Sequence, residues 1–133
     1  MPKVDKYRGK VKEELEELTI EEFMPLLTSR ARRALRRATT KAGQLRKLIK
    51  KASKLKSTNP GKVIRTHMRE AVIIPAWLGM TFAVHNGKEW KSVVITVDKL
   101  GYRLGDFSHT TGRVLHSGPG VGATRGSKFI PLK

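Results

Sequence analysis

Apolar residues recur at steps of three and four between residues 29 and 57, the spacing that lines one face of an α-helix. The remaining faces are almost entirely Arg and Lys, and Gly43 weakens the middle of the pattern. At residues 58–61 a Pro-Gly pair is placed as in a type II turn, which would end the helix. The pattern therefore predicts one long basic helix. Its apolar positions are Ala31, Ala34, Leu35, Ala38, Ala42, Leu45, Leu48, Ile49, Ala52 and Leu55.

After this turn the pattern changes from helical to strand-like. Residues 63–64 and 72–74 are short β-branched runs, which favour strands. Apolar runs at 81–84 and 90–97 flank the tetrapeptide His-Asn-Gly-Lys, and an Asn-Gly pair is typical of the type I′ turn of a β-hairpin. The sequence thus predicts an α+β fold. We expect a small domain with a three-stranded antiparallel or mixed sheet and short helices, preceded by the basic helix and followed by a Gly-rich extended tail.

Two short helices are expected outside the periodic stretch. A capping box, Thr-Ile-Glu-Glu at 19–22, predicts a helix that begins at Thr19. Thr96 is placed to cap a second helix, in which Leu100 and Leu104 share a face and Gly105 ends it. Residues 1–12 show no period and are typical of an extended or disordered arm.

Three segments follow from these elements. Residues 1–62 form an N-terminal extension with an acidic short helix and the long basic helix. Residues 63–107 form the globular core, and residues 108–133 form an extended, basic, Gly-rich tail.

The charge is large and unevenly distributed. Lys and Arg number 28 against 11 Asp and Glu, which gives a net charge of +17. Seven of the acids lie between Asp5 and Glu22, and none follows until Glu70. The cations between Arg30 and Arg69 therefore repel one another unless a polyanion neutralises them, and phosphates do so with release of counterions. On this ground we predict that the helix binds nucleic acid, with contacts from Arg32, Arg33, Arg36, Arg37, Lys47, Lys50 and Lys51.

Several classes of protein are disfavoured. With no cysteine the chain has no disulfide and no thiolate metal site, which fits a reducing, cytoplasmic compartment. No apolar run approaches the roughly 18 residues of a membrane span, and the charged N-terminus is unlike a signal peptide. The apolar face of the basic helix is rich in Ala, whereas helices that lie on membranes use Trp, Phe and Leu. No membrane partner is predicted.

Candidate catalytic residues do not form a recognisable set. The glycines at 118–122 and 126 lack the spacing of a phosphate-binding loop. His67, His85, His109 and His116 have no acid cluster beside them, and a His67–Glu70 pair favours a local hydrogen bond over an acid–base couple. Trp77 and Trp90 stand among β-branched residues, which favours core packing over base stacking. We predict a protein that is not an enzyme and has no metal or cofactor.

A series of motifs begins with Ile-Arg-Thr-His at 64–67. It continues through Ile-Ile-Pro at 73–75, Phe-Ala-Val-His-Asn-Gly-Lys at 82–88, Leu-Gly-Asp-Phe at 104–107 and the ending at 120–133. In this series, over about seventy residues, the chain resembles the S-nineteen family of small-subunit ribosomal proteins. The ending, and the acidic-then-basic N-terminal extension, resemble the archaeal and eukaryotic form of that family.

The resemblance implies a structural protein in the head of the small ribosomal subunit, bound to small-subunit ribosomal RNA and supporting translation near the decoding region. It also implies an S-thirteen family protein as neighbour and a C-terminal tail that can approach transfer RNA. The RNA contacts that it implies are Arg65, His67, Arg69, His85, Asn86, Gly87, Lys88, Arg103, Arg113, Arg125 and Lys128. Two positions depart from the family pattern: Ala76 replaces the usual acid, and Thr111 replaces an Arg whose absence weakens a phosphate clamp at 110–114.

Two other functions are compatible with parts of the pattern. Composition alone would allow a general, chromatin-type nucleic-acid-binding protein, which should not prefer A-form RNA to duplex DNA. An enzyme acting on RNA would need His67 or His85 as its base.

Overall fold

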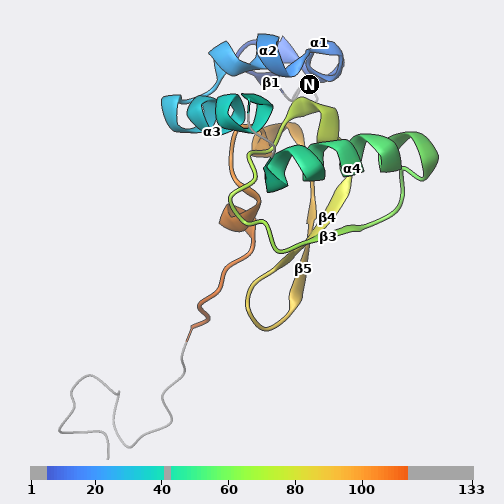
Figure 1. Cartoon of the computed structure of the whole chain (residues 1–133), viewed down its shortest axis with the longest axis vertical. Helices are drawn as coiled ribbons and strands as arrows, with labels where there is room; N and C mark the ends of the chain where they lie inside the picture. The colour runs from blue at the N-terminus through green and yellow to red at the C-terminus, as the bar shows by residue number, and fades with distance from the viewer. Residues whose placement is uncertain (1–5, 41–42, 114–133) are drawn as a thin grey trace, which may run out of the picture.

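The computed structural model describes residues 6–40 and 43–113, and it has the expected α+β fold (Figure 1). The helices are α1 (Lys12–Glu17), α2 (Ile20–Phe23), α3 (Ser29–Thr40) and α4 (Gln44–Thr58). The strands are β1 (Lys6–Tyr7), β2 (Lys10–Val11), β3 (Ile64–Thr66), β4 (Thr81–His85) and β5 (Trp90–Val94). Single 3₁₀ turns lie at η1 (Met24–Leu26), η2 (Pro75–Trp77), η3 (Val97–Lys99) and η4 (Leu104–Phe107).

A mixed three-stranded sheet carries the C-terminal half of the described residues. Its order is β3-β4-β5, with β3 parallel to β4 and β4 antiparallel to β5. Ile64, Phe82, Val84 and Val93 point to the buried face, whereas the alternate positions point away from it. The predicted three-stranded sheet is confirmed. Residues 72–74 are buried but form only one isolated bridge, Val72 to Arg103, so the strand expected there is wrong.

The predicted hairpin is present, but its turn is not type I′. The last pair of the ladder is His85 with Trp90, which leaves four residues in the loop. Gly87 has a φ of +103°, but Asn86 does not have a positive φ, and a type I′ turn needs both. Instead the Asn86 side-chain oxygen accepts from the backbone N–H of Lys88 (2.9 Å) and of Glu89 (2.8 Å). Side-chain chemistry therefore shapes this loop.

The long basic helix is divided in two. α3 ends at Thr40, and Gly43 is the extended N-cap residue of α4. The pattern was continuous because Ala38 and Leu45, seven residues apart, both face the same core. After α4, Lys62 N–H donates to the Asn59 carbonyl (3.2 Å), but Gly61 lacks the positive φ of a type II turn.

The N-terminal arm is more ordered than predicted from residue 6 onward. β1 and β2 are extended, as one of the two expected alternatives allowed, but they pair antiparallel and α1 follows directly, so the alternative of a disordered arm is wrong for residues 6–12. The capping box is confirmed: Thr19 N–H donates to the Glu22 carboxylate (3.0 Å), and Glu22 N–H donates to the Thr19 hydroxyl (3.4 Å). The backbone and then the side-chain hydrogen bond from Thr19 lower the pKa of Glu22 below its ordinary value.

The helix expected after Thr96 is two separate 3₁₀ turns, η3 and η4. Thr96 precedes η3, but its side chain makes no cap hydrogen bond. Leu100 and Leu104 are both buried, as expected, although Gly105 lies inside η4 rather than after it. The fully buried Ser108 side chain donates to the Val84 carbonyl (3.3 Å) and holds this segment against β4.

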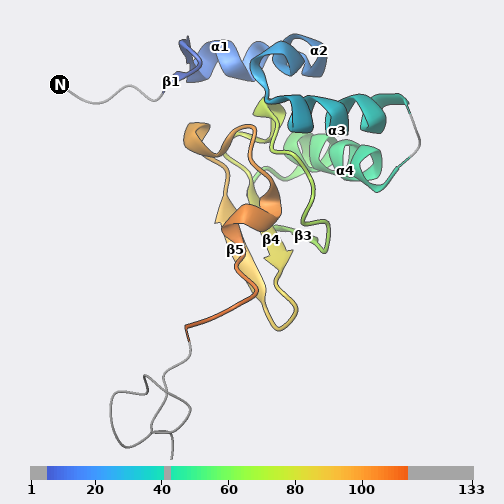
Figure 2. The ribbon, with the colours of Figure 1, turned by 90° about the vertical axis from the view of Figure 1, so that its left-hand side faces the viewer.

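The helices and the sheet share one hydrophobic cluster. Leu15 of α1, Phe23 of α2, Leu35 of α3 and Leu48 of α4 belong to the same buried set as Phe82. In Figure 2 α1 and α2 form a layer above α3 and α4, and the sheet lies below α3 and α4. The division of the chain at residue 62 stays a prediction. The shared cluster shows that the parts on either side of it pack together.

The side chain of Tyr7, in β1, lies close to the backbone of Gly101. A Cβ here would lie 2.8 Å from the Tyr7 hydroxyl and 3.0 Å from Leu27, and the φ of Gly101 is +78°. We expect Gly101→Ala to lower the free energy of unfolding by about 2 kcal/mol, from backbone strain plus displacement of Tyr7. Chemical denaturation measures this loss.

Gly79→Ala is the matched control for that experiment. Its φ of +79° imposes the same strain, but a Cβ there meets nothing within 4 Å. The control should lose only about 1 kcal/mol. Equal losses in the two variants would show that the Tyr7 contact contributes nothing.

Candidate nucleic-acid interface

Three adjacent grooves follow the basic helices. The first, which we call the α3 groove, has a volume of about 440 Å³ and lies between α3, the start of α4 and the loop after β3. Four arginines line it, and Glu70 is its acid. The arginines are Arg30, Arg33, Arg37 and Arg103. Four positive side chains around one depression favour occupation by phosphate.

The second groove, the α4 groove, lies between α4 and β3. It has a volume of about 290 Å³ and is lined by Lys47, Lys51, Arg65 and His67. These four residues come from α4 and from β3 with the residue that follows it, two consecutive elements of the chain, and all four were predicted to contact RNA. Met68, with Gln44, lines both this groove and the α3 groove, so the two are continuous.

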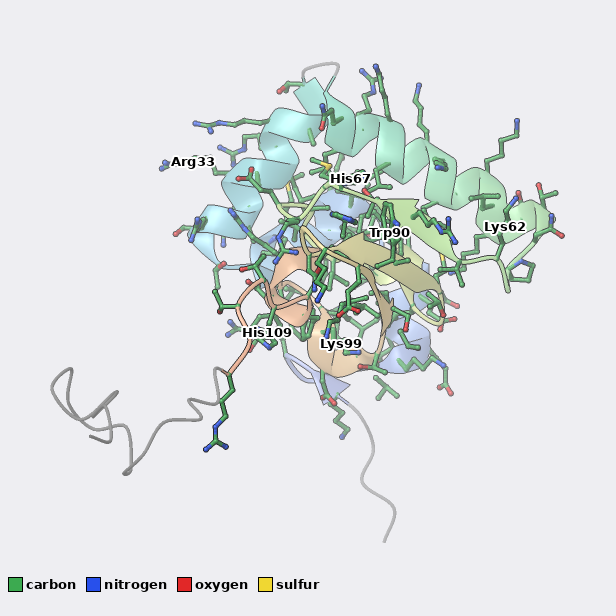
Figure 3. The ribbon with its side chains drawn as sticks, turned by 90° about the horizontal axis from the view of Figure 1, so that it is seen from below. Arg33, Lys62, His67, Trp90, Lys99 and His109 are labelled. Atoms are coloured by element: carbon green, nitrogen blue, oxygen red, sulfur yellow. The ribbon has the colours of Figure 1, made fainter. Side chains whose placement is uncertain are left out.

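The third groove, the turn groove, continues past the end of α4. It has a volume of about 430 Å³ and adds Lys54 and Lys62 to Lys51 and Arg65, which it shares with the α4 groove. Figure 3 looks onto this side and shows Arg33, His67 and Lys62 in order along the two helices. We call the three grooves together the basic band. Glu70 is the one acid among the residues that line it.

Three aromatic rings meet beside the α4 groove. The ring centroids of His67 and His85 are 4.8 Å apart, those of His67 and Trp90 are 4.8 Å apart, and those of His85 and Trp90 are 4.9 Å apart. The guanidinium carbon of Arg65 lies 5.8 Å from the Trp90 ring centroid. Trp90 is 39% exposed, so the prediction that it packs in the core is wrong. The same prediction is confirmed for Trp77, which is 1% exposed and lies against Phe82.

Arg69 was predicted to contact RNA, but its guanidinium donates to groups of the protein. Its guanidinium donates to the carbonyls of His85 (2.8 Å) and Gly105 (3.1 Å), to the Ser108 hydroxyl (3.2 Å) and to the Ser108 carbonyl. It therefore joins the end of β4 to η4. That it contacts RNA stays a prediction, but its donors already bind the protein.

Arg32 is used in a similar way on α3. It donates to the carbonyls of Met24 (3.1 Å), Pro25 (3.3 Å) and Leu27 (3.0 Å), which end the turn before the helix. The Met24 carbonyl also accepts from Leu27 N–H (3.2 Å), which closes the same turn. The guanidinium of Arg32 thus closes the corner between η1 and α3, away from the basic band.

The hairpin tip presents side chains rather than free backbone donors. Gly87 N–H donates to Nδ1 of His85 (3.0 Å), and the next two amides donate to Asn86, as described above. Asn86 also donates through its side-chain nitrogen to the His109 carbonyl (3.4 Å). Lys88 is exposed. A phosphate at this tip would therefore be bound by Lys88 and not by the loop amides.

The other predicted contacts are dispersed. Lys50 and Arg36 are exposed on α4 and α3, and neither lines the basic band. Arg113 is exposed at the end of the described residues, whereas Arg125 and Lys128, with the rest of the tail, lie outside them. Sequence reasoning left Arg30, Lys54 and Lys62 out of the site. Their positive charge and their spacing can be read from the sequence, but only the fold shows that they line the same grooves as the predicted residues.

The described part of the chain holds no cluster of metal-binding side chains. Residues 6–40 and 43–113 hold no group of three or more His, Asp or Glu side chains that could bind a metal ion. His67 lies beside aromatic rings, and no hydrogen bond joins it to Glu70 within these ranges, so the expected pair is wrong. Among the same residues, no helix is long and apolar enough to cross a membrane.

Comparison with known proteins gives a consistent result. The family model described as Ribosomal protein S19 matches residues 33–116. The chain is 47% identical over 132 residues to the small ribosomal subunit protein uS19 of Methanococcus maripaludis strain S2, which covers 96% of this chain and 81% of that protein. It is 41% identical over 133 residues to the protein of the same name from Cenarchaeum symbiosum strain A, with both chains covered in full.

Proposed function

Because this chain belongs to the ribosomal protein S19 family, we propose that it is a structural component of the small ribosomal subunit that binds small-subunit ribosomal RNA through the basic band. The continuity of the three grooves is the observation that carries this proposal. Cations from α3, α4, β3 and the turn after α4 share a single surface, and Glu70 alone opposes them. A phosphate backbone that follows this surface would release counterions along its whole length.

The shape of the surface favours folded RNA over a flat or extended partner. The band follows two helices that cross different parts of the sheet domain, so one bent backbone or two neighbouring strands could occupy it. Contacts of this kind go mainly to phosphate and ribose, and specificity then comes from shape.

Three finer parts of the proposal go beyond the described residues. We place the protein in the head of the small subunit, with an S-thirteen family protein as its neighbour. We also propose that the tail, residues 108–133, reaches transfer RNA near the decoding region, since it carries Arg125 and Lys128 in a segment of small residues. The role is structural, and no reaction is assigned to the protein.

The proposal predicts a steep dependence of binding on salt. Full-length protein is titrated with a fragment of small-subunit ribosomal RNA at several salt concentrations, and the association constant is measured by filter binding or anisotropy. If six or more phosphates are contacted, the log–log slope should be about −5 or steeper. Duplex DNA of equal length should compete poorly, because its B-form grooves present phosphates differently. A slope near zero, or equal competition by DNA, would contradict the proposal.

A further inference from the structure

We propose that the exposed indole of Trp90, held between His67 and His85, is a stacking site for one unpaired base of RNA. The inference rests on the proposed function and adds to it a contact with a base, whereas the basic band itself offers contacts with phosphate. Each of the three rings comes from a different strand or strand end. His67 follows β3, His85 ends β4 and Trp90 begins β5.

The rings are held in place before any ligand arrives. Trp90 pairs with His85 at the last position of the β4–β5 ladder, and the interplanar angle between these two rings is 68°. The interplanar angle between the rings of His67 and Trp90 is 65°, so both histidines pack against the indole in an edge-to-face arrangement. His85 is itself fixed, because its Nδ1 accepts from Gly87 N–H at 3.0 Å. An indole restrained on two sides loses little rotamer freedom when a ligand binds.

A base fits the remaining open surface better than an apolar protein surface does. The indole is 39% exposed at the edge strand, and the positive guanidinium of Arg65 lies 5.8 Å from its centroid. The nearby carboxylate of Glu89 pairs with Lys91 at 3.5 Å, so its charge is partly neutralised. Every base has a π-face that can stack on such a ring, and the neighbouring cation favours the phosphate attached to it.

The position of the cluster next to the basic band supports the same occupant. Arg65 and His67 belong to the ring cluster and also line the α4 groove with Lys47 and Lys51. A strand whose phosphates lie in that groove would therefore have a base within reach of Trp90. Figure 3 shows the labelled side chains of His67 and Trp90 next to each other beneath α4.

The experiment uses the full-length protein and two probes of equal length: a single-stranded RNA oligomer and an oligomer with the same phosphates but without bases. Tryptophan fluorescence and anisotropy follow binding. Trp77 is 1% exposed and supplies a constant background. The RNA should quench the emission of Trp90, whereas the abasic oligomer should bind without quenching. Trp90→Leu should bind RNA about tenfold more weakly and bind the abasic oligomer as the unchanged protein does.

Two further variants complete the test. Trp90→Phe keeps a ring and should recover most of the affinity for RNA, whereas Tyr102→Leu removes another exposed aromatic (56% exposed) that does not line the α4 groove and should change nothing. Equal RNA binding by Trp90→Leu and the unchanged protein would overturn the stacking site, as would binding without quenching. If Trp90→Leu instead impaired only association with a protein neighbour, the occupant would be protein and the inference would be wrong. In each of these cases salt-dependent RNA binding still supports the proposed function, whereas binding of neither probe would contradict the proposed function as well.

Discussion

Replacing Lys47 and Lys51 together with Gln is expected to weaken binding to small-subunit ribosomal RNA by about tenfold to a hundredfold. Both side chains are exposed and line the α4 groove, one helical turn apart. Each lost phosphate contact also removes about 0.7 to 0.9 from the log–log salt slope. The slope of the double variant should therefore be shallower by about 1.4 to 1.8. Titrations of the ribosomal RNA fragment at several salt concentrations measure both quantities.

The same helix provides a control with an identical change in charge. Arg46 and Lys50 are also exposed and also four residues apart, but they lie about 100° around the helix axis and line none of the three grooves. If the grooves account for binding, replacing both with Gln should leave the slope nearly unchanged, whereas a clearly shallower slope would support the RNA contact predicted for Lys50. If the two double variants weakened binding equally, net charge and not the basic band would account for affinity.

Arg69→Ala is expected to lower the free energy of unfolding by about 3 kcal/mol. The change removes the donors to two carbonyls and to the hydroxyl and carbonyl of Ser108, whose side chain is fully buried. These hydrogen bonds are part-buried, so acceptors left without a donor regain only part of their hydration. Thermal or chemical unfolding followed by circular dichroism measures the loss.

Arg69→Lys separates the role of charge from the role of the forked guanidinium. Lysine keeps the positive charge but cannot donate to His85 and Gly105 at once in the same plane. We therefore expect it to recover less than half of the lost stability. Under conditions where both variants are folded, their salt slope for RNA should match that of the unchanged protein. A stable Arg69→Ala variant with a shallower slope would show instead that Arg69 contacts phosphate.

Local sequence signals predicted the elements that local chemistry controls. The capping box of Thr19 and Glu22 and the hairpin around Asn86 and Gly87 are present because their residues satisfy neighbouring backbone groups. The mixed sheet was one of two arrangements expected, and the parallel pairing of β3 with β4 could not be chosen from the apolar runs alone.

The division between α3 and α4 was not predictable from periodicity. Ala38 and Leu45 are both buried against the same core, so the apolar spacing continues across the break. Gly43 carried a weak signal, because an isolated glycine in a helical pattern is tolerated at a cost of about 1 kcal/mol. In the fold Gly43 has an extended backbone and is the N-cap residue of α4.

The site was predictable in its charge but not in its geometry. Lys47, Lys51, Arg65 and His67 were all expected to contact RNA, and the fold brings them into one groove. Arg32 and Arg69 look the same as these in the sequence, yet the fold uses their guanidinium groups for carbonyls of the protein. Trp90 was wrongly assigned to the core. Its β-branched neighbours indicate a strand, but they do not show that this strand lies at the edge of the sheet.

The hydrogen bonds of Arg69 can form only after the later part of the chain has been synthesised. Their acceptors lie 16, 36 and 39 residues further along the chain. A nascent polypeptide emerges from its N-terminus, so α3 and α4 are exposed while the segment that closes β4 against η4 is still being made. During that interval the most cationic part of the molecule has already been made, whereas the contacts that close the domain form only once residue 108 has been added.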